Sequence, residues 1–416
     1  MADNDYQIHT FANGIRLIHK EVTHSRIAHL GFVLDIGSRD ELPGEEGLAH
    51  FWEHMAFKGT EHRKAFHILN RLETVGGELN AYTTKEKIAF HASLLDSHYQ
   101  KAAELLTDIT FRSTFPAKEI EKERQVILEE MAMYRDTPDE AIFDELDAQV
   151  FAGHPLGVNI LGTPEAVRSF DRPAFRTFLA RNLDTDRVVF ASVANMPFRR
   201  VVKLMQPLLG DLPPARRTGP PRIPPGLTTP TLLREERPGT QTHTLLGRAA
   251  PSLHQPERLP FFMLVNILGG PGANSRLNLA LRERHGLVYG VDSGYTPFTD
   301  AGQFSIYFAT DPGQVNRALQ LIERELRRLR EVPLGTLQLH QAKEQLMGQL
   351  AMAEESNAGL MQVLGKGLLD AGRIESLPEL FALIKAVSAK DLQTLAEQYL
   401  QPESFFRITY YNDDKA

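Results

Sequence analysis

Apolar and polar residues alternate in several short segments that come before helix-like apolar stretches. Residues 15–22 (IRLIHKEV) and 27–37 (IAHLGFVLDIG) alternate in this way before Gly47, and residues 242–250 (THTLLGRAA) do so in the second half of the chain. A period of two is typical of a strand with one buried face, so we expect strands there. The apolar stretches that follow, from Gly47 and from Leu259, predict helices.

The order of predicted elements occurs twice, at an offset of about 215 residues. Residues 94–131 predict the end of a strand, a helix, a break at Phe115-Pro116 and a second helix. Residues 308–350 repeat this order, with the break at Val332-Pro333. We therefore predict an α+β protein with two homologous domains, each a largely antiparallel sheet covered by helices.

A proline-rich segment divides the chain nearly in half. The segment 210–230 (GDLPPARRTGPPRIPPGLTTP) contains seven prolines and three glycines. Proline is poorly tolerated inside helices and central strands, so this segment predicts a stiff, extended linker. A chain of 416 residues also exceeds what one core usually serves. We predict a first domain over 1–212, a linker over 213–229 and a second domain over 230–416.

Composition and charge exclude several classes of function. The formal net charge is −7 and no Lys/Arg-rich block occurs, so neither a nucleic acid nor a membrane is an expected partner. The chain has no cysteine, which excludes disulfides, thiolate metal sites and cysteine nucleophiles. No apolar run is long enough to span a bilayer, and the first residues do not have the pattern of a targeting segment. These features predict a cytoplasmic protein.

Two histidines and a glutamate lie within five residues of the apolar stretch 47–60 (GLAHFWEHMAFKGT). In a helix, His50 and His54 are one turn apart and share a face, so both imidazoles can bind one metal ion. Glu53 lies beside that face in the order H-x-x-E-H, where a carboxylate can accept a proton from an activated water. The motif alone leaves a second interpretation open, namely a half-buried helix whose histidines are satisfied by hydrogen bonds.

A zinc hydrolase needs a third protein ligand and an open fourth position. Because the chain has no cysteine, a carboxylate from another element is the natural candidate. Residues 121–134 (EKERQVILEEMAMY) contain Glu123 and Glu130 seven positions apart, on one face of a helix. The alternative for such a glutamate-rich helix is a solvated acidic face.

Four segments together resemble the inverted-motif zinc metallopeptidases, which include pitrilysin, insulin-degrading enzyme and the mitochondrial processing peptidase. They are residues 37–60, 79–91, 123–131 and 269–295. Because they lie in matching order across both halves, the resemblance covers essentially the whole chain. It implies a short two-domain bacterial type of zinc endopeptidase, with one zinc ion per chain and two domains that form half of a clamshell chamber.

The resemblance assigns roles to five residues of the first half. His50 and His54 resemble the zinc-binding histidines, and Glu53 resembles the general base. Glu130 lies where the family has its third zinc ligand. Glu123, two turns earlier in the same helix, resembles the carboxylate that orients a ligand histidine.

Four further residues match segments that contact substrate in the family. Asn80 and Ala81 match the segment that holds the substrate as an added strand on a sheet edge, although residues 79–84 alone read as an ordinary strand. Arg282 and Tyr289 match a pair that reaches the substrate carbonyl beside the zinc. From the sequence alone, both could equally be surface residues near the end of a helix.

Chain length adds an inference about assembly. Larger relatives contain four such units in one chain, whereas this chain has two, so the resemblance implies that a second chain completes the chamber. A homodimer would be self-sufficient, because each chain has both the zinc set and the Arg282/Tyr289 pair, and we expect that pair to act in trans. A heterodimer with a homologous subunit stays open.

The resemblance implies unfolded peptides or presequence-like segments as substrates. Acidic residues near 41–46 and 129–140 favour basic peptides if they line the chamber, whereas on outer faces they only keep the protein soluble. Two other functions stay open. One is a scaffold subunit, although scaffold relatives usually have damaged zinc motifs. The other is a maturation peptidase dedicated to one small peptide.

Overall fold

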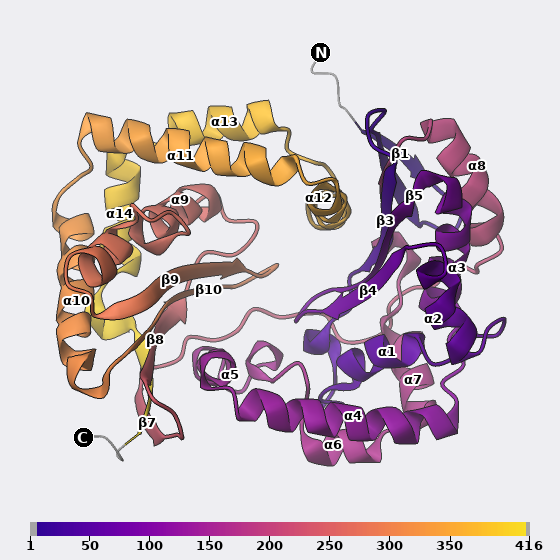
Figure 1. Cartoon of the computed structure of the whole chain (residues 1–416), viewed down its shortest axis with the longest axis horizontal. Coiled ribbons are helices and arrows are strands. Elements are labelled where there is room, and N and C mark those ends of the chain that lie inside the picture. Colours follow the sequence, from indigo (N-terminus) through magenta and orange to yellow (C-terminus); the bar gives the residue numbers. More distant parts are fainter. Residues whose placement is uncertain (1–5, 413–416) are drawn as a thin grey trace. The chain divides into compact units, whose positions relative to one another are not determined.

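The structure of the chain is a computed structural model that describes residues 6–412 (Figure 1). These residues form two compact units, each built around one β-sheet. Unit 1 comprises the described residues up to Met131, Val158–Arg222 and Met352–Ser376. Unit 2 comprises Ala132–Gly157, Ile223–Ala351 and the described residues from Leu377. The predicted α+β class, with two sheets covered by helices, is confirmed.

The sheet of unit 1 has six strands in the order β1-β2-β6-β3-β5-β4. All neighbouring strands are antiparallel except β2 and β6. The edge strand β4 pairs on one side with β5, and within the described residues no strand pairs with its other side. The strands are Gln7–Thr10 (β1), Arg16–Glu21 (β2), Ile27–Leu34 (β3), Glu78–Thr83 (β4), Ile88–Leu95 (β5) and Val188–Ala194 (β6).

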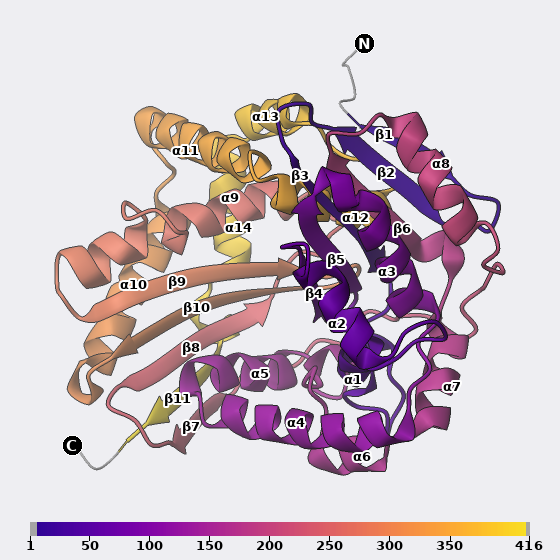
Figure 2. The same cartoon turned by 45° about the vertical axis from the view of Figure 1, so that its right-hand side comes forward.

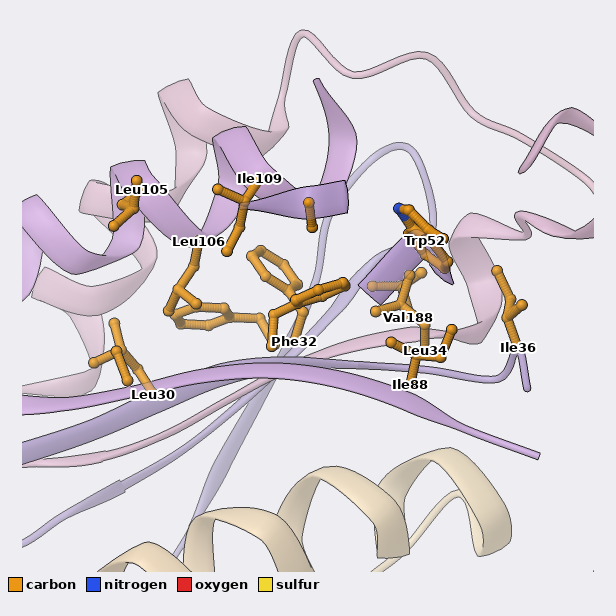
Figure 3. Close-up of a cluster of buried hydrophobic side chains, with 14 of the residues drawn as sticks. Leu30, Phe32, Leu34, Ile36, Trp52, Ile88, Leu105, Leu106, Ile109 and Val188 are labelled. Atoms are coloured by element: carbon orange, nitrogen blue, oxygen red, sulfur yellow. The ribbon is translucent and has the colours of Figure 1, made fainter. Parts of the chain in front are cut away.

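The main core of unit 1 lies between one face of this sheet and its helices. Strand register aligns Phe32 of β3 with Phe90 and Phe190 on the neighbouring strands. Figure 3 shows Trp52 packed beside Leu34, Ile88 and Val188 on the same face of the sheet. The helices are Leu48–Ala56 (α1), Ala65–Glu73 (α2), Tyr99–Phe111 (α3), Ala117–Arg135 (α4), Pro164–Ser169 (α6), Arg172–Asn182 (α7) and Phe198–Leu209 (α8).

The sheet of unit 2 has five strands in the order β7-β11-β8-β10-β9. Only the pair β7 and β11 is parallel. One face is covered mainly by α9, α10 and α14. The strands are Leu232–Glu236 (β7), Thr242–Ala249 (β8), Val288–Pro297 (β9), Gly302–Thr310 (β10) and Phe406–Tyr411 (β11). The helices are Arg258–Gly269 (α9), Val315–Glu331 (α10), Thr336–Glu354 (α11), Leu377–Ala386 (α13), Ala389–Tyr399 (α14) and a π-helical turn, Asn278–Glu283.

Each sheet receives one covering helix from the other half of the sequence. Helix α12, Asn357–Ala371, packs on β3 and β6 of unit 1, and helix α5, Pro138–Val150, packs on β8 and β11 of unit 2 (Figures 1 and 2). Both contacts are close and involve a glycine. Gly365 of α12 lies against Val33, and Gly247 of β8 lies against Leu146 of α5.

The predicted elements and breaks are found in the structure. The predicted strands correspond to β2, β3 and β8, and the two predicted helix breaks separate α3 from α4 and α10 from α11. Phe115 has a φ of 52°, so the chain turns sharply there. Among residues 6–412, no helix combines the length and apolar character needed to cross a membrane.

The proline-rich segment is attached to unit 1 by an arginine whose side chain is only 10% exposed. Residues 213–229 form no helix or strand. Arg222 donates hydrogen bonds of 2.7 Å to Asp35 and to Asp40, both of which are buried. Burial alone would lower the pKa of Arg222, but these carboxylates outweigh it and raise the pKa. The segment is therefore fixed at this point, while the domain limits drawn from the sequence stay a prediction.

Gly365→Ala and Gly348→Ala should change stability in opposite directions. A Cβ at Gly365 would lie 2.7 Å from Val33 Cγ2 in a packed core, whereas a Cβ at Gly348, in α11, has no atom within 4 Å. We expect Gly365→Ala to lower the free energy of unfolding by about 1–3 kcal/mol through overpacking. Gly348→Ala should raise the free energy of unfolding by about 0.5–1 kcal/mol, because alanine has a higher helix propensity than glycine. Urea unfolding of both variants measures this, and a stabilised Gly365→Ala variant would contradict the packing described for α12.

Candidate metal centre

Helix α1 presents its polar motif because its opposite face is buried. The residues of that face recur at the spacing of a helix turn and are fully buried in the core: Leu48, Phe51, Trp52 and Met55. His50, Glu53 and His54 lie between these positions and so point away from the centre of the core. The apolar half of the motif thus determines where its polar half points.

The start of α1 is held by a buried carboxylate. Glu41 accepts hydrogen bonds from the backbone N–H groups of Gly47, at 3.0 Å, and Ala49, at 2.7 Å. These are N–H groups that a helix leaves without partners at its first turn. Gly47 has a φ of 95°, which favours glycine, and a Cβ there would lie 2.4 Å from the backbone oxygen of Leu161. The position of the histidines therefore depends on Glu41 and Gly47.

The structure brings together three of the predicted site residues as possible metal ligands. One donor atom each from His50, His54 and Glu130 lies within 4.8 Å of the others. The two Nε2 atoms are 3.2 Å apart. The carboxylate of Glu130 lies 3.9 Å from Nε2 of His50 and 3.6 Å from Nε2 of His54. The side chains of His54 and Glu130 are 20% and 24% exposed, so the cluster is accessible from solvent.

Burial controls the charge of this cluster. Burial, and then the neighbouring His54, lower the pKa of His50 to about 3. His50 is therefore neutral at physiological pH and keeps one nitrogen lone pair available. Burial raises the pKa of Glu130, and the nearby Glu123 raises it further, against the opposing effect of His54. A cation between these three side chains would relieve both the crowding of lone pairs and the cost of the buried carboxylate.

Glu123 orients His54. Its carboxylate lies 3.0 Å from Nδ1 of His54 and 2.6 Å from the ammonium group of Lys58. Burial alone would raise the pKa of Glu123, but the hydrogen bonds from His54 and Lys58 outweigh it and lower the pKa. An ionised Glu123 accepts a hydrogen bond from Nδ1–H of His54, so Nε2 of His54 is left with its lone pair towards Glu130 and His50.

Helix α4 holds both of its site carboxylates through a buried face. Ile120, Arg124 and Ile127 lie on that face. The guanidinium group of Arg124 donates hydrogen bonds to the backbone oxygens of Phe170, at 2.6 Å, and Arg168, at 3.2 Å. Glu129, next to Glu130, is exposed. These contacts fix both the position of α4 along its axis and its rotation. Glu130 and Glu123, seven residues apart, therefore both face His54.

Glu53 lies beside the three donor atoms and contacts the edge strand. Its carboxylate accepts a hydrogen bond of 2.6 Å from the hydroxyl of Thr83, the last residue of β4. Burial raises the pKa of Glu53, while the bond from Thr83 lowers it and Glu130 raises it. Ala81 lies two residues before Thr83 on the same face of β4, and Asn80 is exposed on the opposite face.

The donor set fits zinc. Two imidazole nitrogens and one carboxylate oxygen are ligands that zinc prefers, and a catalytic zinc site has three protein ligands with a fourth position open. The orienting carboxylate behind His54 is typical of such sites. Nδ1 of His50 is buried and has no hydrogen-bond partner in the described part of the chain, so His50 has no orienting carboxylate of the kind that His54 has.

Arg282 and Tyr289 contact each other in unit 2. The guanidinium carbon of Arg282 lies 5.5 Å from the centre of the Tyr289 ring, within the range of a cation–π interaction. Tyr289 is 87% exposed, and Arg282 forms a weak ion pair with Glu283 at 3.8 Å. The two predicted residues are therefore neighbours on the surface of their unit, and their role stays a prediction.

Sequence reasoning missed three residues that support the site. Thr83 donates a hydrogen bond to Glu53, and Lys58 forms an ion pair with Glu123. Glu41 accepts a backbone hydrogen bond at the start of α1. Thr83 could have been found from the two-residue period of a strand, since it shares a face with Ala81. Lys58 lies four residues after His54, but it follows the end of α1, so helical spacing does not indicate its contact. Nothing in the local pattern distinguishes Glu41 from the other acids near it.

Two family models match consecutive parts of the chain. The model described as insulinase, peptidase family M16, matches residues 16–164, and the model of the peptidase M16 inactive domain matches residues 169–346. The chain is also similar to solved structures. The match to a protease from Helicobacter pylori covers 98% of this chain and 99% of that protease, with a TM-score of 0.90 and 17% identity. A structure titled peptidase M16 inactive domain, from Pseudomonas fluorescens, covers 98% of both chains, with a TM-score of 0.89 and 20% identity.

Curated relatives are similar over nearly the whole chain. An uncharacterized zinc protease of Mycobacterium leprae is 33% identical over 394 residues, which cover 94% of this chain and 88% of the relative. The uncharacterized zinc protease YmxG of Bacillus subtilis is 32% identical over 391 residues, which cover 94% of both chains. The matches to both family models and to these relatives agree with the geometry of the H-x-x-E-H helix, and the chain therefore belongs to peptidase family M16, the insulinase family.

Proposed function

We propose that this protein is a zinc-dependent endopeptidase that hydrolyses unfolded peptides or presequence-like segments in an enclosed chamber formed by two chains. The observation that carries the proposal is the convergence of His50, His54 and Glu130, with Glu53 beside them. A scaffold subunit has no need of such a set. The names of the similar zinc proteases support the same activity.

The proposed reaction needs one residue to move a proton. When bound, zinc polarises the scissile carbonyl and makes the attacking water more acidic. Glu53 accepts the proton of that water and passes it to the leaving amine. The hydrogen bond from Thr83 keeps the carboxylate of Glu53 beside the metal ligands. His50, His54 and Glu130 hold the metal, and Glu123 keeps His54 in the tautomer that binds it.

Substrate would bind as an added strand on β4. This strand is at the edge of its sheet, so its outer backbone groups are available for hydrogen bonds to a peptide. Thr83 connects the same strand to Glu53. A peptide that pairs with Asn80 and Ala81 would thus be held in register with the general base. Because the backbone supplies most of this binding, many sequences could be accepted.

The second chain of the chamber would supply Arg282 and Tyr289. Both side chains are exposed, and a guanidinium and a phenol are suitable donors for the oxyanion that forms at the scissile carbonyl. A homodimer then has two complete sites, each with the zinc set of one chain and the Arg282/Tyr289 pair of the other. In a heterodimer with a homologous subunit, the zinc set of one chain would likewise be completed by the other chain, although the two chains would differ.

The metal-binding assignment predicts different effects for neighbouring glutamates. The purified protein should contain about one zinc ion per chain, and His50→Ala, His54→Ala or Glu130→Gln should each remove most of it. Glu123→Gln should weaken zinc binding by about 10–100-fold, because His54 loses the acceptor that orients it. Elemental analysis and a chelator titration measure these effects. The matched control is Glu129→Gln, which changes the exposed neighbour of Glu130 and should retain zinc.

Substitution of the general base should affect turnover but not zinc binding. Glu53→Gln should retain the metal and lower kcat on a fluorogenic peptide by about 10²–10⁴-fold, because it removes the base and leaves the ligands. Full activity of Glu53→Gln would contradict the role of Glu53. Full zinc content in Glu130→Gln would contradict only the assignment of the third ligand.

Assembly in trans predicts that two inactive variants restore each other. In a mixture of Glu53→Gln and Arg282→Ala chains, half of the dimers are mixed and each has one whole site of two, so about one quarter of wild-type activity should return. A mixture of Glu53→Gln with His54→Ala is the matched control and should recover nothing, because both changes affect the zinc set. No recovery in the first mixture, despite demonstrated subunit exchange, would refute action in trans.

Exposed acids just after α4 and in the first turn of α5 favour basic peptides as substrates. Glu41 and Glu45 bind backbone N–H groups or Arg181, so they add little to a free negative field. Asp136, Asp139 and Glu140, in contrast, are exposed. If they face bound substrate, peptides of net positive charge should have a higher kcat/KM than matched acidic peptides, and salt should reduce the difference. Equal values at low ionic strength would show that these acids do not select substrate.

A further inference from the structure

Unit 2 contains a cavity of about 380 Å³ that the peptidase chemistry does not use. Its walls come from α9, the loop before the π-helical turn, α10 and α11. A volume of this size is at the lower end of the range for small-molecule sites. The cavity can therefore enclose a small molecule and is too small for a folded partner.

This cavity lies at the position that corresponds to the metal centre of unit 1. In the repeated order of elements, α9 corresponds to α1 and α11 corresponds to α4. The metal centre lies between α1 and α4, and the cavity lies between α9 and α11. No histidine lines the cavity, and Glu325 is its single acidic lining residue. The chemistry at this position is therefore cationic in unit 2, where unit 1 has ligands for a cation.

Arg276 is the central cationic group of the cavity. Its side chain is 16% exposed, and its Nη1 atom is buried without a hydrogen-bond partner in residues 6–412. The nearest carboxylate oxygen, on Glu325, lies 3.9 Å from Nη1, which is too far for a hydrogen bond. Burial lowers the pKa of Arg276, Glu325 raises it and Arg328 lowers it. A buried guanidinium with an unused donor is costly unless an acceptor binds there.

Two further arginines line the cavity without an ion-pair partner. Arg284 follows the π-helical turn and Arg328 lies on α10, and neither forms a salt bridge within the described residues. Glu325 is the one carboxylate among the residues that line the cavity, and it also lies 3.9 Å from Arg324 outside the lining. The lining thus has three guanidinium groups and one carboxylate, which is an excess of positive charge.

Neutral donors complete the lining. The hydroxyl of Ser275 is buried and has no hydrogen-bond partner in the described structure. The side-chain amide of Asn266 also lines the cavity and forms no hydrogen bond to a described residue. Unused donors of this kind next to a guanidinium group are typical of a site that binds oxygen atoms of a ligand.

We propose that this cavity binds a small oxyanion through a phosphate or carboxylate group. A guanidinium fork matches the oxygens of either group in a bidentate way. Arg276 contacts the anion from the buried end, and Arg284 and Arg328 contact it from the accessible end. The hydroxyl of Ser275 and the amide of Asn266 donate to the remaining oxygens. The site is separate from the zinc set and does not depend on the proposed peptidase activity.

Calorimetric titration of the zinc-loaded protein with inorganic phosphate and, separately, with succinate tests this proposal. At low ionic strength, Arg328→Gln should weaken binding by about tenfold or more, because a charged hydrogen bond is lost. Arg327→Gln is the matched control. It makes the same change in the preceding residue of α10, which is exposed and does not line the cavity, so the affinity of this variant for the anion should equal that of the wild type. Both positions are exposed, so both variants should fold, and circular dichroism checks this.

Each outcome decides the proposal. Phosphate that binds more tightly than succinate, with loss in Arg328→Gln alone, supports a ligand with a phosphate group. The reverse order, with the same loss, supports a ligand with carboxylate groups. Three results overturn the proposal: no saturable binding of either anion, equal weakening in Arg328→Gln and Arg327→Gln, or binding that Arg328→Gln leaves unchanged.

Discussion

Burial of the apolar face of α1 against the sheet of unit 1 is the interaction on which the candidate site depends. That face determines the rotation of the helix, so His50, Glu53 and His54 have no freedom to turn away from Glu130. Glu41 and Gly47 determine where the helix starts, and Arg124 fixes the opposite helix, α4. A set of three donor atoms from two helices is possible only because both helices are fixed in this way.

The electrostatics of the site follow from the same packing. The core that orients α1 also desolvates His50, which stays neutral, and Glu53, which holds a proton more readily than an exposed glutamate. Glu123 behaves in the opposite way, because two cationic or proton-donating partners outweigh its burial. Burial raises the pKa of Glu53, whereas the partners of Glu123 outweigh its burial, so the carboxylates on two neighbouring helices differ in charge behaviour.

The sequence predicted the fold class and the duplicated order from local patterns, whereas Glu130 was assigned through the resemblance to a family, because it lies on another helix. Helical spacing brings His50 near His54, and strand alternation indicated β2, β3 and β8. Strand alternation places Thr83 on the same face as Ala81, but its hydrogen bond to Glu53 depends on the packing of β4 on α1, which the alternation does not describe. The exchange of α5 and α12 was also not predictable, since the helical periodicity of a segment does not say which sheet it covers. Contacts between residues far apart in the sequence depend on the tertiary fold, and a linear pattern contains little information about them.

The exchanged helices have a consequence for how this chain arose. If the two halves descend from one ancestral repeat, a single copy of that repeat would have left one face of its sheet uncovered, because the helix made for that face packs on the sheet of the other copy. Such an ancestor could have been fully folded only as a domain-swapped dimer, in which each subunit's helix covers the sheet of the other. Under that condition, fusion of the two genes would have made the exchange of helices intramolecular, and the close contacts at Gly365 and Gly247 would correspond to contacts that were once between subunits.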